Sequence, residues 1–260
     1  MKYNPLIIAH RGAMSCAPEN SLSAIKLALK YPVSGIEFDL QLTQDNIPVL
    51  YHDRTLHKIT ARKKRVSDYT YNELLKMDWG TWYSKKYRGE KILAFKNILS
   101  KYASITRLLI EIKSRKIDST TGRSKILTSE VLKLLKTHVK QKYAANIYIL
   151  SFDTRVIEFA LKKAPQWKYV QNIKEPPANN RYFNSFSKDL YGFCFPIKNL
   201  STDLVRILRN KRKKVMTYSC NSDRQLKKAL NMNIDYVMTD RPDWIFNNKP
   251  VLQQAQTLRK

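Results

Sequence analysis

The sequence predicts an α/β protein, either a (β/α)8 TIM barrel or an open doubly wound sheet. Eight short apolar stretches recur along the 260 residues, and stretches with helical periodicity separate most of them. Parallel strands joined by helices produce this alternation in both architectures. The length suits one large domain over residues 1–260. A chain in which 43% of the residues are hydrophobic can bury a core without disulfides or a structural metal.

The strand candidates are short, apolar and rich in β-branched or aromatic residues. In chain order they cover residues 6–9, 35–42, 108–112, 147–150, 168–172, 190–195, 214–219 and 236–239. The helix candidates place apolar residues three or four positions apart, and they cover residues 20–30, 128–140, 153–163, 201–210 and 222–231. Asn20 is expected to cap the first of these helices. A further helix over residues 175–188 has the weakest periodicity.

Residues 46–100 interrupt this rhythm. They contain a short strand candidate at 47–51, a basic stretch, a helix candidate at 71–77 and a loop rich in aromatic residues. The segment directly follows the second strand and has no strand–helix alternation of its own. We therefore interpret it as a small insertion within one domain rather than as a separate domain.

The chain is strongly basic, with 48 Lys and Arg against 21 Asp and Glu and a formal net charge of +27. Such a charge favours nucleic acid, an anionic membrane surface or phosphate-bearing small molecules as partners. Zinc-finger spacing, an RNA-binding aromatic motif and a basic zipper are all absent from the sequence, so we expect no specific nucleic-acid partner. The basic run 209–214 is expected to be a solvated surface, with peripheral contact to an anionic membrane as the alternative.

The three cysteines, Cys16, Cys194 and Cys220, are odd in number and widely spaced, which argues against a disulfide framework and a four-cysteine zinc site. The first residues lack the apolar core of a signal peptide. No segment reaches the roughly 20 apolar residues of a membrane-spanning helix. We therefore expect a cytoplasmic protein.

Three acidic residues lie inside apolar strand candidates. Glu37 and Asp39 are two positions apart, so both side chains point to the same face of their strand. Glu111 lies near the end of the following long strand, with Lys113 two positions later. Buried carboxylates repel one another unless a cation lies between them, and oxygen ligands suit Mg²⁺, Ca²⁺ or Mn²⁺. The alternatives to a cation site are a solvated acidic strand face for Glu37 and Asp39 and a local ion pair between Glu111 and Lys113.

Two histidines follow strand candidates. His10 and Arg11 end the first strand, and His52 follows the short strand of residues 47–51. Two histidines beside a carboxylate-bound cation form a general acid/base pair, in which one takes a proton from the attacking oxygen and the other gives one to the leaving oxygen. Arg11 and the cation would neutralise charge on the reacting group. His57 and His138 have no comparable neighbours in the sequence.

Together these motifs resemble the glycerophosphodiester phosphodiesterases, which are (β/α)8 barrels that hydrolyse glycerophosphodiesters to an alcohol and glycerol 3-phosphate. The resemblance extends over nearly the whole chain and favours the barrel over the open sheet, with a small insertion after the second strand. It rests on His10-Arg11-Gly12, Pro18-Glu19-Asn20-Ser21, Glu37-x-Asp39-x-x-x-Thr43, Pro48-Val49-x-x-His52-Asp53, Glu111-x-Lys113 and Thr239-Asp240-x-Pro242.

By this resemblance, Glu37, Asp39 and Glu111 are expected to hold one divalent cation, Mg²⁺ or Ca²⁺, and His10 and His52 to be the acid/base pair. The expected partner is a small-molecule glycerophosphodiester such as glycerophosphocholine or glycerophosphoethanolamine, with lysophospholipids as a close alternative. The residues expected to contact the substrate or its phosphate are Arg11, Lys113, Glu19 and Tyr218.

The chain departs from the family pattern at residues 61–65 and 233–236, and Tyr218 stands where tryptophan is usual. These departures concern the insertion and the leaving group. The basic runs 62–65 and 113–116 follow strands, so we expect them on the active-site face, where they attract anionic phosphodiesters. The competing hypothesis is a basic binding protein on a barrel scaffold that has lost catalysis. The complete set of acids and histidines argues against it.

Overall fold

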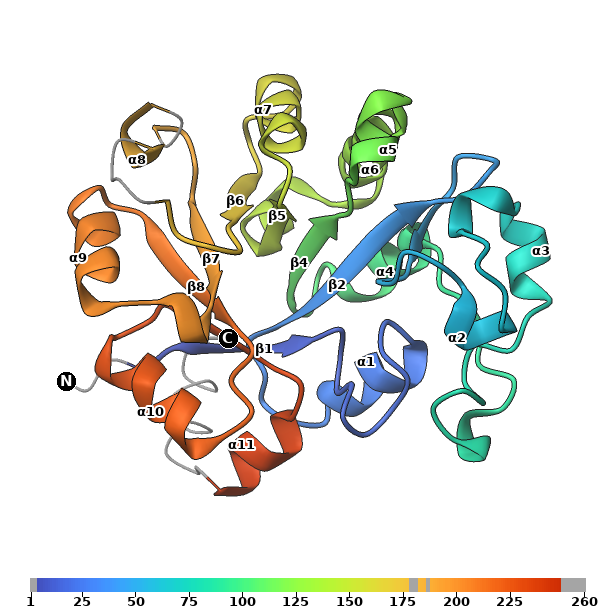
Figure 1. The fold of residues 1–260 in the computed structure, drawn as a ribbon, viewed down its shortest axis with the longest axis horizontal. Helices are drawn as coiled ribbons and strands as arrows, with labels where there is room; N and C mark the ends of the chain where they lie inside the picture. Colours follow the sequence, from blue (N-terminus) through green and yellow to red (C-terminus); the bar gives the residue numbers. More distant parts are fainter. Residues whose placement is uncertain (1–3, 178–181, 186–187, 249–260) are drawn as a thin grey trace.

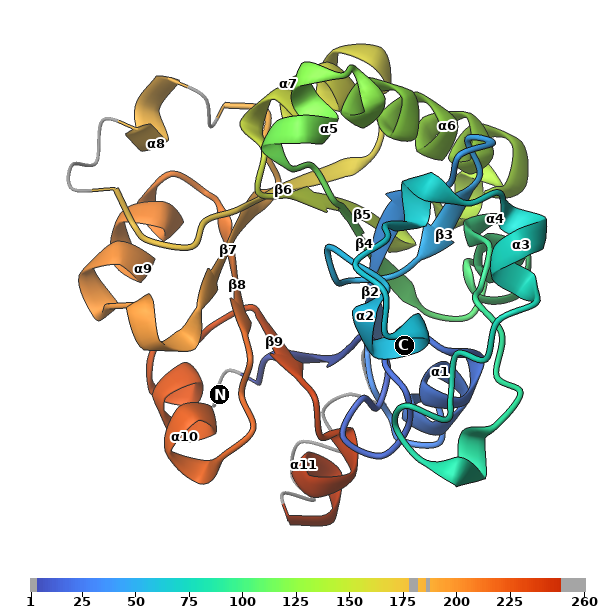
Figure 2. The same ribbon diagram turned by 45° about the vertical axis from the view of Figure 1, so that its right-hand side comes forward.

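Eight parallel strands close into a barrel in the computed structural model, which describes residues 4–177, 182–185 and 188–248. β1 pairs in parallel with β2 on one side and with β9 on the other. This closure confirms the barrel and excludes the open sheet (Figures 1 and 2). The strands of the ring are β1 (Leu6–His10), β2 (Gly35–Leu42), β4 (Arg107–Ile112), β5 (Ile147–Ser151), β6 (Lys168–Asn172), β7 (Gly192–Pro196), β8 (Lys214–Tyr218) and β9 (Tyr236–Thr239).

Helices surround the ring of strands (Figure 2). The apolar faces of these helices, apart from the short helix at residues 116–120, which has no buried residue, pack against the outer faces of the strands in one continuous cluster. They are α1 (Leu22–Ala28), α4 (Phe95–Tyr102), α5 (Lys116–Thr120), α6 (Arg123–His138), α7 (Thr154–Lys163), α8 (Tyr182–Ser185), α9 (Thr202–Asn210), α10 (Asp223–Asn231) and α11 (Pro242–Asn248). Within the described residues, a helix with the length and hydropathy needed to cross a membrane is not found.

Alternation along β2 separates the core from the site. Phe38 and Leu40 belong to the cluster between strands and helices, whereas Glu37 and Asp39 point to the other face, the barrel interior. All eight residues of β2 are buried. The interior below these acids is filled by a second apolar cluster, which includes Leu109, Cys194 and Met216. The acids therefore lie above a packed core, at the carboxyl end of the barrel.

Most of the predicted helices are confirmed, but the structure differs from the prediction at three places, and α4, α5 and α11 were not predicted. Asn20 does not cap α1, because the Ser21 side chain accepts from the backbone N–H of Ala24 and is the N-cap. α6 begins at Arg123 rather than at residue 128, since buried residues continue its apolar stripe toward the N-terminus. Of the predicted helix 175–188, the structure describes only α8 as helical, and residues 178–181 and 186–187 lie outside the described residues.

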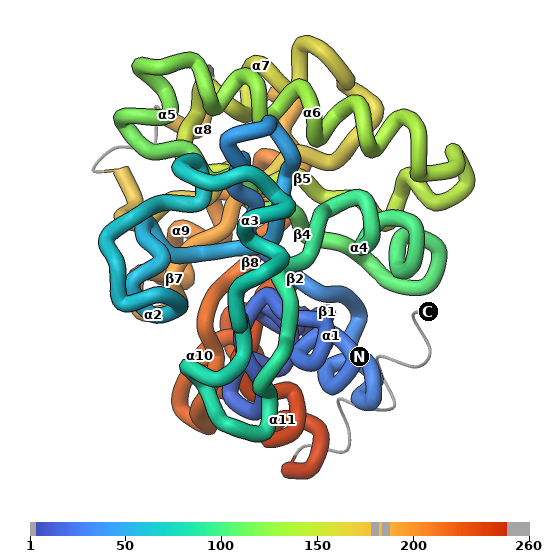
Figure 3. The backbone as a smooth tube through the Cα atoms, turned by 90° about the vertical axis from the view of Figure 1, so that its right-hand side faces the viewer, coloured from blue at the N-terminus to red at the C-terminus, as the bar shows by residue number. Residues whose placement is uncertain are grey.

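The segment after β2 has its own small core. It contains β3 (Pro48–Leu50), which pairs antiparallel with β2, α2 (His57–Thr60) and α3 (Tyr71–Leu75). Its buried side chains form a separate cluster that includes Tyr51, Leu74 and Trp79. α4, by contrast, packs on the main core. The residues after α3 run along the side of the barrel that carries α1 (Figure 3), where Glu90 accepts from the backbone N–H of Leu22 at 3.1 Å.

Candidate functional site

The carboxyl ends of three neighbouring strands bring the predicted acids and one histidine together. In the strand register, His10 of β1 lies opposite Glu37 of β2, and Asp39 lies opposite Glu111 of β4. Oxygen atoms of Glu37, Asp39 and Glu111 lie within 4.8 Å of one another. The parallel pairing of β1, β2 and β4 thus converts three separate sequence motifs into one carboxylate cluster.

Burial makes this cluster electrostatically costly. Glu37, Asp39 and Glu111 are 2%, 1% and 7% exposed. Burial raises the pKa of Glu37 well above its usual value, and the charges of Asp39 and Glu111 raise it further. Burial likewise raises the pKa of Glu111. For Asp39, burial is outweighed by Lys113 and Arg11, which hold its pKa below the usual value. Glu37 and Glu111 are therefore harder to ionise than ordinary glutamates when no further cation is near.

Arg11 and Lys113 supply the positive charge of the cluster. Arg11 Nε lies 3.2 Å from Asp39 Oδ2, and its backbone N–H donates to Glu37 at 3.1 Å. Lys113 Nζ lies 2.8 Å from Asp39 Oδ1 and also hydrogen-bonds Glu111. Burial lowers the pKa of each base, but the carboxylates outweigh it and hold both values above the usual ones. Both predicted phosphate contacts are thus inside the site.

A divalent cation fits this cluster on its donor set. Glu37, Asp39 and Glu111 present only oxygen ligands, converge from two adjacent strands and are buried. Their three negative charges face two positive charges from Arg11 and Lys113, which leaves one negative charge uncompensated. A hard dication suits these oxygen atoms and offsets the repulsion that, after burial, raises the pKa of Glu37.

His10 is oriented by the carboxylate of Asp240, the residue directly after the last strand, β9. Its Nδ1 lies 2.6 Å from Asp240 Oδ1, and its Nε2 lies 3.8 Å from Glu37 Oε2. Asp240 accepts a further hydrogen bond from Asn221. Burial opposes ionisation of Asp240, but its hydrogen bond and charge interaction with His10 hold its pKa below the usual value. When Nδ1 donates to Asp240, Nε2 of the neutral ring is a proton acceptor directed toward the acids.

Tyr218 packs against this histidine. It ends β8, and its ring stacks on His10 with ring centroids 6.5 Å apart. Burial raises the pKa of the Tyr218 hydroxyl. The structure therefore places Tyr218 at the site, beside a candidate catalytic group.

His52 reaches the site from the segment that follows β3. Its Nδ1 lies 2.9 Å from Asp53 Oδ1, so a carboxylate orients this ring as well. The hydrogen bond from His52 is the main reason that the pKa of Asp53 is lowered. Lys58 Nζ forms ion pairs with both Asp53 Oδ2, at 2.9 Å, and Glu19 Oε1, at 2.6 Å. Glu19 also accepts from Arg11 at 3.0 Å, which links both histidine-bearing segments at the edge of the site.

A cleft of about 520 Å³ opens beside these groups. His52, Glu111 and Lys113 line it, together with Phe152 from the segment after β5. The cleft therefore gives a substrate access to candidate catalytic, ligand and phosphate-contact residues at once. The basic run 209–214 joins α9 to the amino end of β8, at the opposite end of the barrel.

Sequence analysis missed three groups that hold the site together. Asn20 and Asp39 are hydrogen-bonded at 2.9 Å, Asn172 of β6 donates to Glu111 at 3.1 Å, and Asp240 orients His10. Asn172 Oδ1 is buried and has no hydrogen-bond partner among the described residues, so it remains an acceptor for a bound group. Asp240 was part of a quoted motif, but only the closed ring places it beside His10.

Comparison with known proteins agrees with this geometry. The model of the glycerophosphoryl diester phosphodiesterase family matches residues 10–244. The glycerophosphodiester phosphodiesterase of Caldanaerobacter subterraneus subsp. tengcongensis is 28% identical over 247 residues, which cover 93% of this chain and 96% of that protein. That of Bacillus subtilis is 24% identical over 249 residues, which cover 92% of this chain and 84% of that protein.

Solved structures of similar fold include an Oleispira antarctica phosphodiesterase in complex with the product sn-glycerol-3-phosphate. It is 25% identical with a TM-score of 0.82, and the match covers 94% of this chain and 96% of that one. The Thermotoga maritima glycerophosphodiester phosphodiesterase has a TM-score of 0.75 at 22% identity, over 96% of this chain and 100% of that one. The latter likeness concerns the fold.

Proposed function

Because this chain belongs to the glycerophosphoryl diester phosphodiesterase family, we propose that it hydrolyses glycerophosphodiesters to an alcohol and glycerol 3-phosphate. The observation that carries the proposal is the buried carboxylate cluster flanked by two histidines, each oriented by its own carboxylate. The similar Oleispira antarctica enzyme binds sn-glycerol-3-phosphate, which is the product expected here.

Glu37, Asp39 and Glu111 are the proposed ligands of one divalent cation, Mg²⁺ or Ca²⁺. When bound, the cation supplies positive charge that stabilises the reacting phosphate. The donor set, burial and uncompensated negative charge of the cluster support this assignment. Asn20 and Asn172 fix two of these carboxylates through their hydrogen bonds, and they are proposed as positioning residues.

His10 and His52 are the proposed acid/base pair. Water or the substrate's own glycerol 2-hydroxyl attacks phosphorus, and the bond between phosphorus and the leaving alcohol oxygen breaks. One histidine accepts the proton of the attacking oxygen through Nε2, and the other donates a proton to the leaving oxygen. Their Nδ1 contacts to Asp240 and Asp53 support this role, because they leave Nε2 of each ring for the substrate.

Arg11 and Lys113 are proposed to contact the phosphate oxygens, since their positive charges already lie among the carboxylates. Glu19 holds Arg11 in place at the edge of the site. Tyr218 is proposed to form the wall beside His10 on which the substrate packs.

The deciding experiment measures glycerol 3-phosphate released from glycerophosphocholine and glycerophosphoethanolamine, with EDTA and with Mg²⁺ or Ca²⁺ restored. We expect release that stops with EDTA and returns with one of the two cations. His52→Ala, purified in the same way, controls for a contaminating host enzyme. Folded wild-type protein that releases nothing under any condition would contradict the proposal for these substrates, and lysophospholipids would then be tested.

A further inference from the structure

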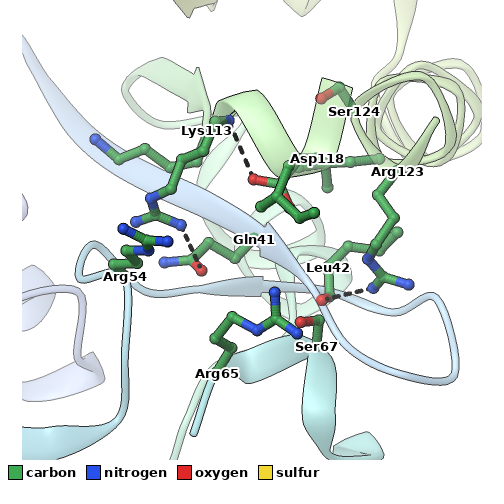
Figure 4. Close-up of a pocket in the computed structure, with 12 residues that line it drawn as sticks. Gln41, Leu42, Arg54, Arg65, Ser67, Lys113, Asp118, Arg123 and Ser124 are labelled. Carbon is green, nitrogen blue, oxygen red and sulfur yellow. Dashed lines mark hydrogen bonds between the residues drawn. The ribbon is translucent and has the colours of Figure 1, made fainter. Parts of the chain in front are cut away.

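A second pocket adjoins the catalytic cleft and is strongly basic. The insertion, the end of β2, the loop after β4 and the start of α6 form its walls. Figure 4 shows Arg54 and Arg65 of the insertion and Arg123 of α6 placed around Gln41 and Leu42. Basic and acidic side chains that line it are Arg54, Arg65, Lys113, Arg115, Arg123 and Asp118.

We propose that this pocket binds a second phosphate group, carried by the leaving alcohol of the substrate. Arg54, Lys113 and Arg115 line both the catalytic cleft and this pocket, so the two cavities share a wall. The glycerol 3-phosphate part of the substrate has no charge beyond the phosphate that reacts. A second anionic group must therefore belong to the alcohol. This inference rests on the proposed function, since it assigns chemistry to the part of the diester that leaves.

The pocket has more positive charge than its own acids balance. Lys113 is already paired with Asp39 and Glu111 in the carboxylate cluster. That leaves four arginines against Asp118 among the lining residues, and one of the four, Arg65, is also paired with Asp68 at 3.2 Å. Arg54 makes no hydrogen bond or ion pair with any described residue. Burial lowers the pKa of Arg115, and the like charge of Arg54 lowers it further despite Asp118. An anion in the pocket would relieve this repulsion.

Two of the arginines are held in place before any ligand binds. Arg123 donates to the backbone carbonyls of Leu42 at 3.1 Å and Thr43 at 2.7 Å. Arg115 donates to Gln41 Oε1 at 3.3 Å and to the carbonyl of His52 at 3.1 Å. Fixed, planar guanidinium groups suit phosphate oxygens better than mobile surface lysines do. The positive end of the 16-residue helix α6, which begins at Arg123, adds to the same potential.

The size of the pocket limits its ligand. Its volume is about 30 Å³, enough for two or three water molecules if each needs roughly 10–15 Å³. This space takes two or three oxygen atoms of one phosphate group, and a whole nucleotide or an acyl chain is too large for it.

The test compares two diesters that differ by one glycerophosphate unit, which carries the second phosphate: glycerophosphoglycerol and bis(glycerophospho)glycerol. We expect wild-type protein to hydrolyse the second with a higher kcat/KM, beyond the statistical factor of two from its two equivalent ends. Arg65→Gln should reduce this preference by about fivefold, because one charge-assisted contact is lost. Arg123→Lys should reduce it as well, since lysine cannot make the two-pronged contact. The matched control is Arg62→Gln, an exposed arginine of the same basic run that does not line the pocket.

Each outcome separates the pocket from the general charge of the protein and from the proposed function. If the preference for bis(glycerophospho)glycerol falls equally in Arg62→Gln and Arg65→Gln, it arises from long-range electrostatic attraction. That result would overturn the proposed phosphate-binding pocket. Equal kcat/KM for the two diesters in wild-type protein would overturn it while leaving the proposed function intact. If neither diester is hydrolysed, the proposed function fails. Equilibrium binding of both compounds to wild-type, His52→Ala and Arg65→Gln protein then tests the phosphate-binding pocket independently of catalysis. The supporting result is that the compound with two phosphates binds more tightly to wild-type and His52→Ala protein, and that Arg65→Gln loses this difference.

Discussion

Asn20 and Asp39 exchange two hydrogen bonds across the base of the site. Asn20 Nδ2 donates to Asp39 Oδ2 at 2.9 Å, and the backbone N–H of Asp39 donates to Asn20 Oδ1 at 3.2 Å. Both residues are buried. The backbone of Asn20 adopts a left-handed conformation with φ of 56°, which asparagine tolerates better than most residues. The adjacent Ser21 takes the capping role that sequence analysis expected of Asn20.

Asn20→Ala and Ser21→Ala are therefore expected to impair different properties, metal binding and turnover in the first variant and folding stability in the second. Asn20→Ala frees the Asp39 side chain and should lower metal affinity and turnover about 10-fold or more. Ser21→Ala removes the α1 N-cap and should cost about 1 kcal/mol of unfolding free energy with little effect on turnover. Urea unfolding and a metal titration of activity measure the two effects. Equal loss of metal affinity in both variants would contradict the assignment.

His10→Ala and His52→Ala should each reduce kcat about 10²-fold or more while the fold persists, because each removes a proton-transfer group. Rates of glycerol 3-phosphate release, with circular dichroism as a check on folding, provide the measurement. His138→Ala is the matched control, since His138 lies at the end of α6 and contacts the carbonyl of Leu134. Wild-type rates in both site variants would remove the acid/base assignment.

Asp240→Asn should lower kcat by less than His10→Ala, with KM nearly unchanged. The amide cannot stabilise a protonated His10 as the carboxylate does at 2.6 Å. A shift of the pH profile of kcat should accompany the loss, and a purely structural role of Asp240 would not produce one. An unaltered profile with lower stability would assign Asp240 to packing.

Metal binding should raise the melting temperature of the wild-type protein. A ligand at 100 times its Kd stabilises the folded state by about 2.7 kcal/mol. Thermal unfolding with EDTA, Mg²⁺ or Ca²⁺ measures this shift. Glu37→Gln should lose most of it, because one of the three carboxylates is gone. If Glu37→Gln keeps the full shift and its sensitivity to EDTA, Glu37 is not a ligand.

The metal-free protein should become less stable as the pH rises above the usual glutamate value of 4.5. The folded-state pKa of Glu37 and that of Glu111 are raised, so the folded state keeps protons that the unfolded state has released. Stability is therefore lost as the pH rises through the raised values. Asp53 and Asp240, with lowered pKa values, act in the opposite sense only below about pH 3.8.

Unfolding by urea in EDTA at several pH values between 4.5 and 7.5, chosen to span roughly the range above the glutamate value, measures this slope. Glu37→Gln should flatten it, and saturating divalent cation should remove it. A slope that is unchanged in Glu37→Gln would mean that other groups cause it.

Local sequence determined the order of the eight barrel strands, the order of most helices and the shared face of Glu37 and Asp39. Alternation of apolar and polar residues is a property of neighbouring positions, so it can be read without the fold. The same holds for the basic runs 62–65 and 113–116 and for the strand ends at His10 and Glu111.

The alternation of strands and helices did not decide whether the ring closes, because it is identical in a barrel and in an open sheet. The motif resemblance favoured the barrel, and the tertiary structure confirms it. Closure through β1 and β9 places Asp240 beside His10, although 230 positions separate them. The partners of the carboxylates, Asn20 and Asn172, also depend on register between distant strands rather than on local pattern. For the same reason, the pocket formed by Arg65 and Arg123 exists only where the insertion meets α6.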